Sequence, residues 1–195
     1  MSFSIPLYWD RLTDGIPAAL AADLILVSDG HALLALEFSP FERRLREQME
    51  KRFREVDWIP RANLQGVREA VRAYFAGEWD PIQALPVNPG GTPFQQQVWQ
   101  MLRGIPVGET RTYGELAAQL GHPHGARAVG MANARNPIAI VIPCHRVIGA
   151  GADLRGYAGG LERKRWLLAH EANQAPVCVE LRTGTDTPVQ LSLIG

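Results

Sequence analysis

The stretch TYGELAAQLGHPHGARAVGMANAR, residues 112–135, decides how the second half of this 195-residue chain folds. Thr112 and Glu115 stand three residues apart, which is the spacing of a capping box at the start of a helix. Gly121 predicts the end of that helix after about two turns. After a short turn, residues 125–135 predict a second helix. Two short helices joined by a tight turn that contains glycine predict a helix-turn-helix unit.

The second of these helices has almost no side-chain bulk. Six of its eleven residues are glycine or alanine, and Arg127 and Arg135 stand out from them. A smooth helix of this kind can approach a nucleic-acid groove closely and push one side chain between bases. The alternative is that the small residues only let two helices pack tightly, and composition alone favours this alternative.

Another helix start lies upstream. Thr92 as N-cap, Pro93 at the first helical position and Gln95 at the third predict a second capping box, and Gly104 predicts where this helix ends. Residues 87–91 come directly before it and are dominated by proline and glycine, so they predict a linker.

The segments that follow residue 135 are less regular. Residues 136–142 predict a short buried strand or extended run, and residues 149–160 predict a glycine-rich loop or small β-wing. Residues 161–171 predict an amphipathic helix, whereas residues 176–195 carry no motif that indicates a function. The side chains of this helix expected to turn partly inward are Leu161, Trp166, Leu167 and Leu168.

Residues 1–91 predict an α/β arrangement. Two apolar runs, residues 24–28 and 32–38, flank Asp29 and Gly30, a pair that favours the positive φ angles of a type I′ hairpin turn. The other expected elements are a strand over residues 3–9 and helices over residues 44–55 and 64–76, the last ended by Gly77.

Composition is that of a globular protein, with 46% apolar residues. No run approaches the ~20 apolar residues of a membrane span, and the first residues lack the pattern of a secretion signal, so we expect a cytoplasmic protein. Residues 1–91 carry 10 Lys and Arg against 13 Asp and Glu, whereas residues 92–175 carry 9 against 5. Eight of those nine cations are arginine, so a nucleic acid would bind the C-terminal half.

Cys144 stands at the end of an apolar run and directly before His145 and Arg146. A thiol needs a basic or cationic neighbourhood to become a nucleophile, but a lone cysteine is also a common residue in a buried core. Adjacent residues do not face each other in regular structure, so the pair needs a turn or a bridging water. A carboxylate that orients the imidazole could come from Glu171 or Asp153, and sequence does not choose between them.

Zinc is the alternative role for the cysteine and the histidines. The spacing does not fit, because the chain has neither a C-x-x-C nor an H-E-x-x-H pattern. We therefore expect no metal and no other cofactor.

Taken together, five ordered motifs resemble those of the O6-alkylguanine-DNA alkyltransferases. The likeness is strong over residues 92–171 and looser over residues 1–91, where Tyr74-Phe-Ala-Gly77 carries it. The motifs are Thr112-Tyr113, Arg127-Ala-Val-Gly130, Asn136-Pro137, Pro143-Cys-His-Arg-Val-Ile-Gly149 and Gly156-Tyr-Ala-Gly-Gly160.

The resemblance implies a role for individual residues. Cys144 would accept the alkyl group, activated through a water by His145, with Glu171 orienting the imidazole and Asn136 holding the turn. Tyr157 would hydrogen-bond the base, while Arg127 would fill the gap that the extruded nucleotide leaves and Tyr113 would press on a phosphate. Further expected DNA contacts are Gln95, Gly114, His122, Arg135 and Ala150. The expected pocket residues are Val147, Ala158, Ala139 and Arg155; the last two depart from residues found in some relatives.

The resemblance also implies a fold and an activity. The fold would be α+β: a ribonuclease-H-like α/β domain (residues 1–86), a linker (87–91), a mostly helical winged helix-turn-helix domain (92–175) and a C-terminal tail (176–195). The protein would be a monomer that binds alkylated duplex DNA through the minor groove, flips the base and transfers the alkyl group once to Cys144. It would associate with the nucleoid when bound. The alternatives are a non-catalytic lesion-binding protein and a cysteine hydrolase that ignores DNA.

Overall fold

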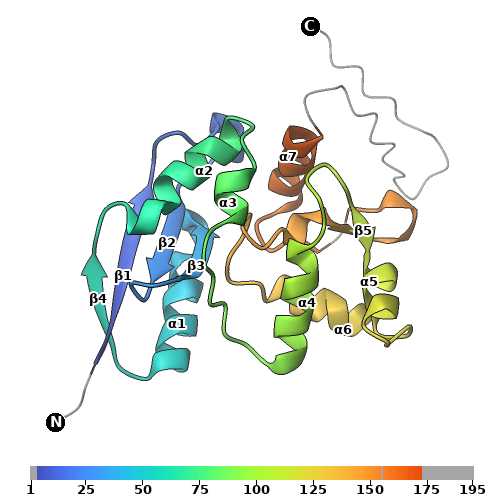
Figure 1. Ribbon diagram of the computed structural model, residues 1–195, viewed down its shortest axis with the longest axis horizontal. Helices are drawn as coiled ribbons and strands as arrows, with labels where there is room; N and C mark the ends of the chain where they lie inside the picture. The colour runs from blue at the N-terminus through green and yellow to red at the C-terminus, as the bar shows by residue number, and fades with distance from the viewer. Residues whose placement is uncertain (1–3, 155, 173–195) are drawn as a thin grey trace, which may run out of the picture. The chain divides into compact units, whose positions relative to one another are not determined.

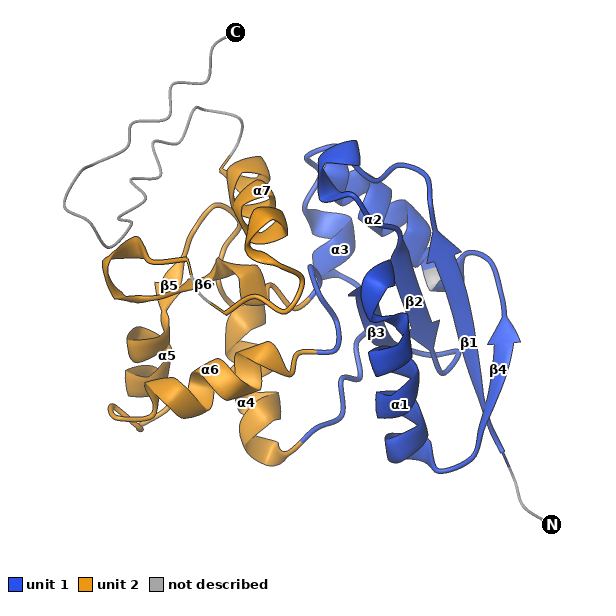
Figure 2. Ribbon diagram, turned by 180° about the vertical axis from the view of Figure 1, so that it is seen from behind, with its two compact units in different colours: residues 1–91, 137–141 blue, residues 92–136, 142–195 orange. Residues whose placement is uncertain are grey.

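The structure is a computed structural model that describes residues 4–154 and 156–172. Its chain forms two compact units, coloured separately in Figure 2. The first consists of residues 1–91 and 137–141, and the second of residues 92–136 and 142–195. The predictions for Arg155 and for the tail lie outside the described residues.

A four-stranded sheet forms the centre of the first unit (Figure 1). Its strand order is β3-β2-β1-β4, in which β2 (Leu24–Ser28) is antiparallel to both of its neighbours, β1 (Ile5–Leu12) and β3 (Leu33–Phe38). The edge strand β4 (Val56–Pro60) runs parallel to β1. The expected strand near the N-terminus is thus confirmed, whereas β4 was not predicted, because Asp57 and a terminal proline interrupt its apolar pattern.

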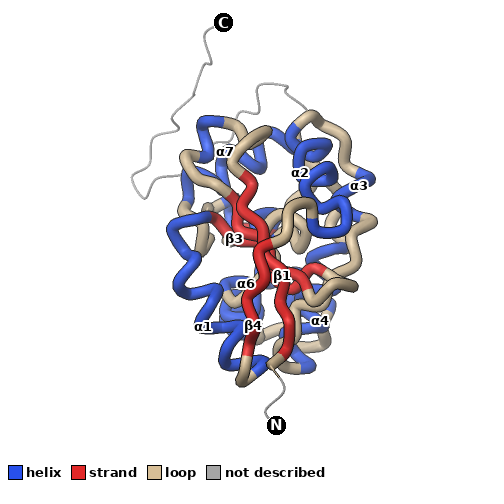
Figure 3. Tube along the Cα trace, turned by 90° about the vertical axis from the view of Figure 1, so that its left-hand side faces the viewer, coloured by secondary structure: helices blue, strands red, loops and turns tan. Residues whose placement is uncertain are grey.

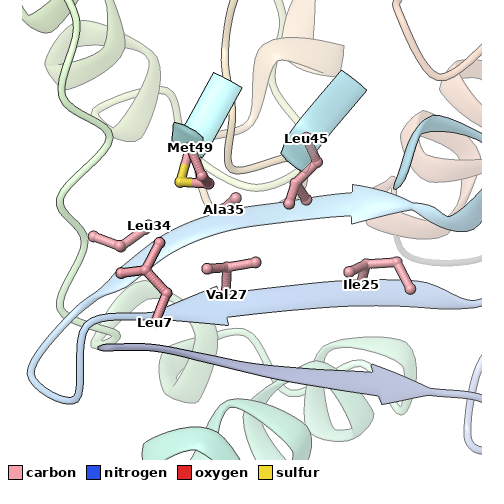
Figure 4. Packing of buried hydrophobic residues seen from close by; sticks show 7 residues of the cluster. All are labelled: Leu7, Ile25, Val27, Leu34, Ala35, Leu45 and Met49. Carbon is pink, nitrogen blue, oxygen red and sulfur yellow. The ribbon is translucent and has the colours of Figure 1, made fainter. Parts of the chain in front are cut away.

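Helix α1 (Glu42–Phe53) packs on this sheet through a cluster of apolar side chains. Figure 4 shows Leu45 and Met49 reaching from α1 onto the strands, close to Ala35 of β3. Each of these two α1 side chains is only 2% exposed, and complete burial of a side chain of this size contributes about 1.5–3 kcal/mol. The helix starts with Glu42 and has Lys51 and Arg52 in its last turn, a charge order that suits the helix dipole.

Helices α2 (Val67–Phe75) and α3 (Asp80–Gln83) lie on the other side of the strands from α1 (Figure 3). The predicted helix over residues 64–76 is confirmed, with its first turn wound as a 3-10 helix, η3 (Leu64–Gly66). Gly77 follows it with φ of +89°, as expected for a glycine that ends a helix. Helices on both sides explain why all residues of β2 and β3 are buried.

The outer edge of β3 is covered by two extended segments of the first unit. Leu33 donates its N–H to the Pro86 carbonyl (2.8 Å) and accepts from the N–H of Asn88 (2.9 Å). Leu36 donates to the Pro137 carbonyl (2.9 Å) and accepts from Ala139 (2.8 Å). The predicted linker is therefore partly bound to the sheet, and the sheet has no exposed edge here.

The hairpin between β2 and β3 is confirmed, but its predicted two-residue type I′ turn is wrong. Residues 29–32 form the loop, and only Gly30 within it has a positive φ, of +93°. The Asp29 side chain accepts from the N–H groups of His31 and Ala32 (both 2.9 Å), which stabilises a wider loop. A register shift at Val27 and Ser28 accommodates the extra residues.

Helices dominate the second unit. Helix α4 (Pro93–Arg103) starts with the predicted capping box of Thr92 and Gln95, and Gly104 ends it. Helix α5 (Tyr113–Gln119) starts with the second box, in which Thr112 accepts from the Glu115 N–H (3.1 Å) and its own N–H donates to Glu115 (2.6 Å). Helices α6 (Ala126–Ala134) and α7 (Leu161–Glu171) are also present as expected.

The structure bears on three further expectations for the second half. Residues 136–142 form only a single bridge, at Ile138, because the chain turns at Ile140, whose φ is +69°. The described part of residues 149–160 is a loop with a short 3-10 turn, η5 (Ala150–Ala152), as one of the two alternatives expected, and β5 (Arg111–Thr112) pairs in parallel with β6 (Val147–Ile148) outside it. On α7, Leu161 is 38% exposed and Lys164 is fully buried. No helix of the described ranges is long and apolar enough to cross a membrane.

Candidate active site

Cys144 starts a short 3-10 turn, η4 (Cys144–Arg146), that follows the buried run of residues 138–142. Its N–H donates to the Ile142 carbonyl (2.8 Å), and the residue is 7% exposed. The 3-10 turn breaks the regular alternation of an extended run, in which Cys144 and His145 would point to opposite sides. The turn required by the sequence argument is therefore present.

His145 lies fully buried beside Glu171, the last residue of α7. The distance from His145 Nε2 to Glu171 Oε1 is 2.9 Å. The residues alone left two carboxylates open as partners of the imidazole, and the structure brings that of Glu171 to it. Asp153 lies in the loop after β6, where its backbone carbonyl accepts from the N–H of Gly149 (2.7 Å). The other ring nitrogen, His145 Nδ1, is buried without a hydrogen-bond partner among the described residues and is available for a proton.

Arg146 completes this buried group by binding the same carboxylate. Its Nε donates to Glu171 Oε2 (2.7 Å) and its Nη2 to Oε1 (2.8 Å), while Nη1 donates to the Ile105 carbonyl (2.6 Å). Burial alone would raise the pKa of Glu171, but His145 and Arg146 outweigh it and hold the pKa well below its usual range. The charge of Arg146, which sequence offered to the thiol, is therefore used by Glu171.

A buried lysine, Lys164, lies in the electrostatic neighbourhood of Cys144. The Lys164 ammonium on α7 is fully buried and donates to the Val147 carbonyl (2.6 Å). Burial lowers the pKa of Lys164 to about 8, and the negative charges of Cys144 and Asp153 oppose that shift. The sequence argument missed Lys164; its only signal was a lysine within the apolar pattern of residues 161–171.

Two buried asparagines hold the backbone around the cysteine. Asn136 Nδ2 donates to the Ile142 carbonyl (2.8 Å), as expected for a residue that secures the turn. Asn133 Nδ2 donates to the carbonyl of Cys144 itself (3.3 Å), a contact that sequence reasoning missed. An asparagine on the inner face of a predicted helix was the signal for it.

Two tyrosines lie close to this group. Burial, together with the nearby Cys144 charge, raises the pKa of Tyr113. A Cβ atom added to Gly156, whose φ is +62°, would lie 3.3 Å from the Tyr113 hydroxyl, so glycine permits this close approach. Tyr157 is 9% exposed, and its ring centroid lies 6.5 Å from that of His145.

Most of the expected DNA contacts lie on the surface of the second unit. Arg127 on α6 and Arg135, which directly follows that helix, are exposed, and Met131, one turn from each, is 51% exposed. The Gln95 side chain accepts from the Thr92 N–H (2.8 Å) in the capping box and is only partly exposed. The other residues expected to contact DNA are all exposed; they are Gly114, His122 and Ala150.

A surface pocket of about 520 Å³ lies beside the turn between α5 and α6. His122 packs edge-on against Phe94, with ring centroids 6.3 Å apart. The other lining residues are Gly121, Pro123, His124, Gly125 and Ala128.

The expected pocket residues differ in burial and in the unit to which they belong. Val147 is fully buried and its carbonyl faces Lys164, whereas Ala158 is exposed. Ala139 is buried in the segment that pairs with β3 in the first unit. No group of three or more His, Cys, Asp or Glu residues that could hold a metal ion occurs within the described ranges.

Comparisons with known proteins agree with these features. A family model described as the 6-O-methylguanine DNA methyltransferase DNA-binding domain matches residues 93–173. A methylated-DNA--protein-cysteine methyltransferase of Shigella flexneri is 44% identical over 162 residues, which cover 82% of this chain and 95% of that protein. One from Mycobacterium leprae is 56% identical over 121 residues, covering 61% and 72%.

Solved structures show the same likeness. The crystal structure of Mycobacterium tuberculosis OGT in complex with DNA superposes with a TM-score of 0.70 at 41% identity, covering 87% of this chain and 96% of that one. The methyltransferase of Pyrococcus kodakaraensis gives a TM-score of 0.66 at 27% identity, covering 85% and 98%. The mixed arrangement of sheet and helices is thus shared, and the chain belongs to the methylated-DNA--protein-cysteine methyltransferase family.

Proposed function

We propose that this chain repairs DNA by transferring an alkyl group from O6 of guanine, and also from O4 of thymine, to Cys144. The observation that carries the proposal is the buried turn on which Cys144 precedes His145, itself paired with Glu171 at 2.9 Å. That turn lies within the residues that match the family model. The names of its relatives describe the same transfer to a protein cysteine.

The reaction is an in-line displacement at a saturated carbon. The sulfur of Cys144 forms a bond to the alkyl carbon, the carbon–O6 bond breaks, and its electron pair stays on the guanine. The thiol proton passes through a water to His145 Nδ1, and Tyr157 donates a hydrogen bond that helps to neutralise the leaving base. The thioether product is stable to water, and a thioether is not cleaved by a thiol under ordinary conditions, so each molecule acts once.

The exposed face of α6 is the part that we assign to DNA. Arg127, Met131 and Arg135 follow one another at intervals of one helical turn on that face. We propose that this face enters the minor groove as part of a winged helix-turn-helix domain, with Arg127 in the base stack and Tyr113 against a phosphate. Extrusion of the nucleotide costs a few kcal/mol, which the inserted arginine partly offsets. The remaining contacts would come from Gln95, Gly114, His122 and Ala150.

The first unit is proposed to be a ribonuclease-H-like domain. A meander of three antiparallel strands whose first strand pairs in parallel with a fourth supports this assignment. We retain the proposed boundaries: residues 1–86, a linker at 87–91, and 92–175 for the DNA-binding domain. A monomer without metal or cofactor is sufficient for the reaction above, and Ala158, Ala139 and Arg155 are proposed to shape the pocket for the alkyl group.

The alternative functions are a non-catalytic lesion-binding protein and a cysteine hydrolase. In non-catalytic lesion-binding relatives a tryptophan typically replaces the cysteine, so Cys144 argues for catalysis. A cysteine hydrolase would turn over repeatedly and would not need the exposed arginines of α6. The buried position of Cys144 beside a basic histidine suits both reactions, so dependence on DNA separates them.

The substitution Arg127→Ala tests this function. It removes the side chain that fills the base stack, so we expect about a 100-fold slower transfer from methylated duplex DNA, equivalent to the few kcal/mol of extrusion. Transfer from free O6-alkylguanine should change less than about threefold, because no base is extruded from a duplex. Arg43→Ala, at a side chain that is 94% exposed in the first unit, is the matched control. Equal losses on both substrates would contradict the extrusion role.

A further inference from the structure

Asn133 is a buried polar residue on α6 that the reaction described above does not use. It is 3% exposed, and its Nδ2 donates to the carbonyl of Cys144 (3.3 Å). The next residue back, Ala132, accepts from Trp99 Nε1 of α4 (2.9 Å), so this part of α6 is fixed to the interior of the unit. Asn133 therefore joins a helix with an exposed arginine face to the backbone of the nucleophile.

The Asn133 side chain also lowers the pKa of Tyr113, at the start of α5, against the larger opposite effect of burial. An amide has this effect when its Nδ2 donates a hydrogen bond to the phenol oxygen. Nδ2 has two hydrogens, which suffice for the Cys144 carbonyl and the Tyr113 hydroxyl. The Tyr113 ring is also within van der Waals reach of α6, 3.8 Å from a Cβ added to Gly130.

Packing alone does not explain an asparagine at this position. Its Oδ1 is buried without a hydrogen-bond partner among the described residues, and an unsatisfied buried acceptor costs stability. A leucine has nearly the same shape and would fill the space without that cost. The residue type is therefore explained by what the amide donates to, not by the volume that it fills.

We propose that Asn133 is a positioning residue that holds the Cys144 carbonyl and the Tyr113 hydroxyl on the helix that carries Arg127. DNA bound to the exposed face of α6 would thereby fix the backbone of the nucleophile from the buried face. The proposal rests on the proposed function, because it concerns the rate of the same transfer. It adds a physical link between the helix that engages DNA and the sulfur that reacts.

The substitution Asn133→Leu removes both donated hydrogen bonds and keeps the volume. We expect transfer from saturating methylated duplex to slow about tenfold, as two lost hydrogen bonds allow, with the half-saturating DNA concentration within twofold of the wild type. Transfer from free O6-alkylguanine should slow less than about threefold, because no DNA holds α6. Equal slowing on both substrates, or no slowing, would overturn the proposal.

Asn136→Leu is the matched control. Asn136 also donates to the backbone before Cys144 but follows α6 rather than lying within it. It should therefore slow both substrates by the same factor. Asn133→Met also lacks the donors and carries no charge, so it should reproduce Asn133→Leu; it replaces that variant if the leucine protein does not fold.

A spectroscopic readout tests the Tyr113 contact independently of activity. In Asn133→Leu the pKa of Tyr113 should rise further. The titration of Tyr113 is followed by the absorbance of ionised tyrosine, after subtraction of the same titration of a protein that also carries Tyr113→Phe. An unchanged titration would overturn the link to Tyr113. A wild-type protein that transfers from neither substrate would refute the proposed function, whereas an active wild type with an unaffected Asn133→Leu protein would refute this inference alone.

Discussion

The interiors of the two units differ in the chemistry of what they bury. Among the described residues, the buried polar or charged side chains of the first unit are Ser28 and Glu37. The second unit buries six: Asn133, Asn136, His145, Arg146, Lys164 and Glu171. All six surround or support the turn that carries Cys144.

The two units therefore differ in what stabilises their interiors. The first unit is stabilised by apolar clusters such as that of Leu45, Met49 and Ala35, and the hydrophobic effect does not depend on the direction of individual contacts. A buried charge is tolerated only when it is paired and hydrogen-bonded, as Glu171 is by Arg146 and His145. The second unit thus buries polar and charged side chains, which costs free energy of folding, around the turn that carries the thiol of Cys144.

The most severe way to break this arrangement is Glu171→Gln. It leaves the buried Arg146 and His145 without their carboxylate, so we expect a loss of about 3–5 kcal/mol in the free energy of unfolding at pH 7. Urea denaturation measures it. Because the folded pKa of Glu171 is lowered, the stability that it contributes is present above its unfolded pKa and is lost as the pH falls towards the folded one.

Glu162→Gln is the control for that loss. Glu162 lies on the same helix, is 87% exposed and pairs with the half-exposed Arg165, so its removal should cost less than about 1 kcal/mol. A loss as small for Glu171→Gln would mean that the buried carboxylate is not structurally required.

Leu45→Ala tests the apolar interior. It removes a side chain that is 2% exposed against the sheet, and we expect unfolding to become easier by about 2–5 kcal/mol. The rate of transfer to Cys144, measured well below the melting temperature, should stay unchanged because no group near the thiol is altered. A slower transfer in the folded variant would show that the two interiors are not separate in function.

The buried Lys164 of the second unit should make the free energy of unfolding depend on pH in the alkaline range. Its folded pKa of about 8 lies below the unfolded value, so between about pH 8 and pH 10 the unfolded chain holds the proton more tightly and stability rises with pH. We expect a rise of about 1 kcal/mol per pH unit that Lys164→Met lacks. The chain's other lysine, Lys51, is exposed, so Lys51→Met should keep the wild-type slope.

Helix starts give the smallest effect. Helices α4 and α5 begin with side-chain capping boxes, whereas α1 and α2 have no side-chain cap. Thr92→Ala removes one box and should cost about 1 kcal/mol of stability without changing transfer. Calorimetry checks it against Ser39→Ala, which precedes α1 and caps no helix by its side chain; equal losses would show that the box adds nothing.

Local signals in the sequence were enough for the helices of the second unit. Capping boxes, stop glycines and apolar spacing depend on neighbouring residues, so Thr92, Thr112 and Gly104 marked the boundaries correctly. Strand β4 and the bridge at Ile138 depend on partners distant in sequence, whereas the loop at residues 29–32 was missed although its contacts from Asp29 are local. Patterns of polar and apolar residues do not specify such pairings.

The site shows the same limit. Motif order singled out Cys144 and His145, and the resemblance named Glu171; the residues alone left Glu171 and Asp153 open, and the fold brings Glu171 to the imidazole. Lys164 and Asn133 were missed, since the burial of a polar residue depends on packing that the sequence does not display. The pairing of Arg146 with Glu171 was not predicted for the same reason.

Mass spectrometry of the protein after mixing with an excess of methylated duplex tests the central proposal most directly. The peptide that contains Cys144 should gain one CH₂, at most once per molecule, while one guanine is restored for each protein. Repaired DNA beside an unmodified Cys144, or more lesions repaired than protein molecules present, would contradict the account.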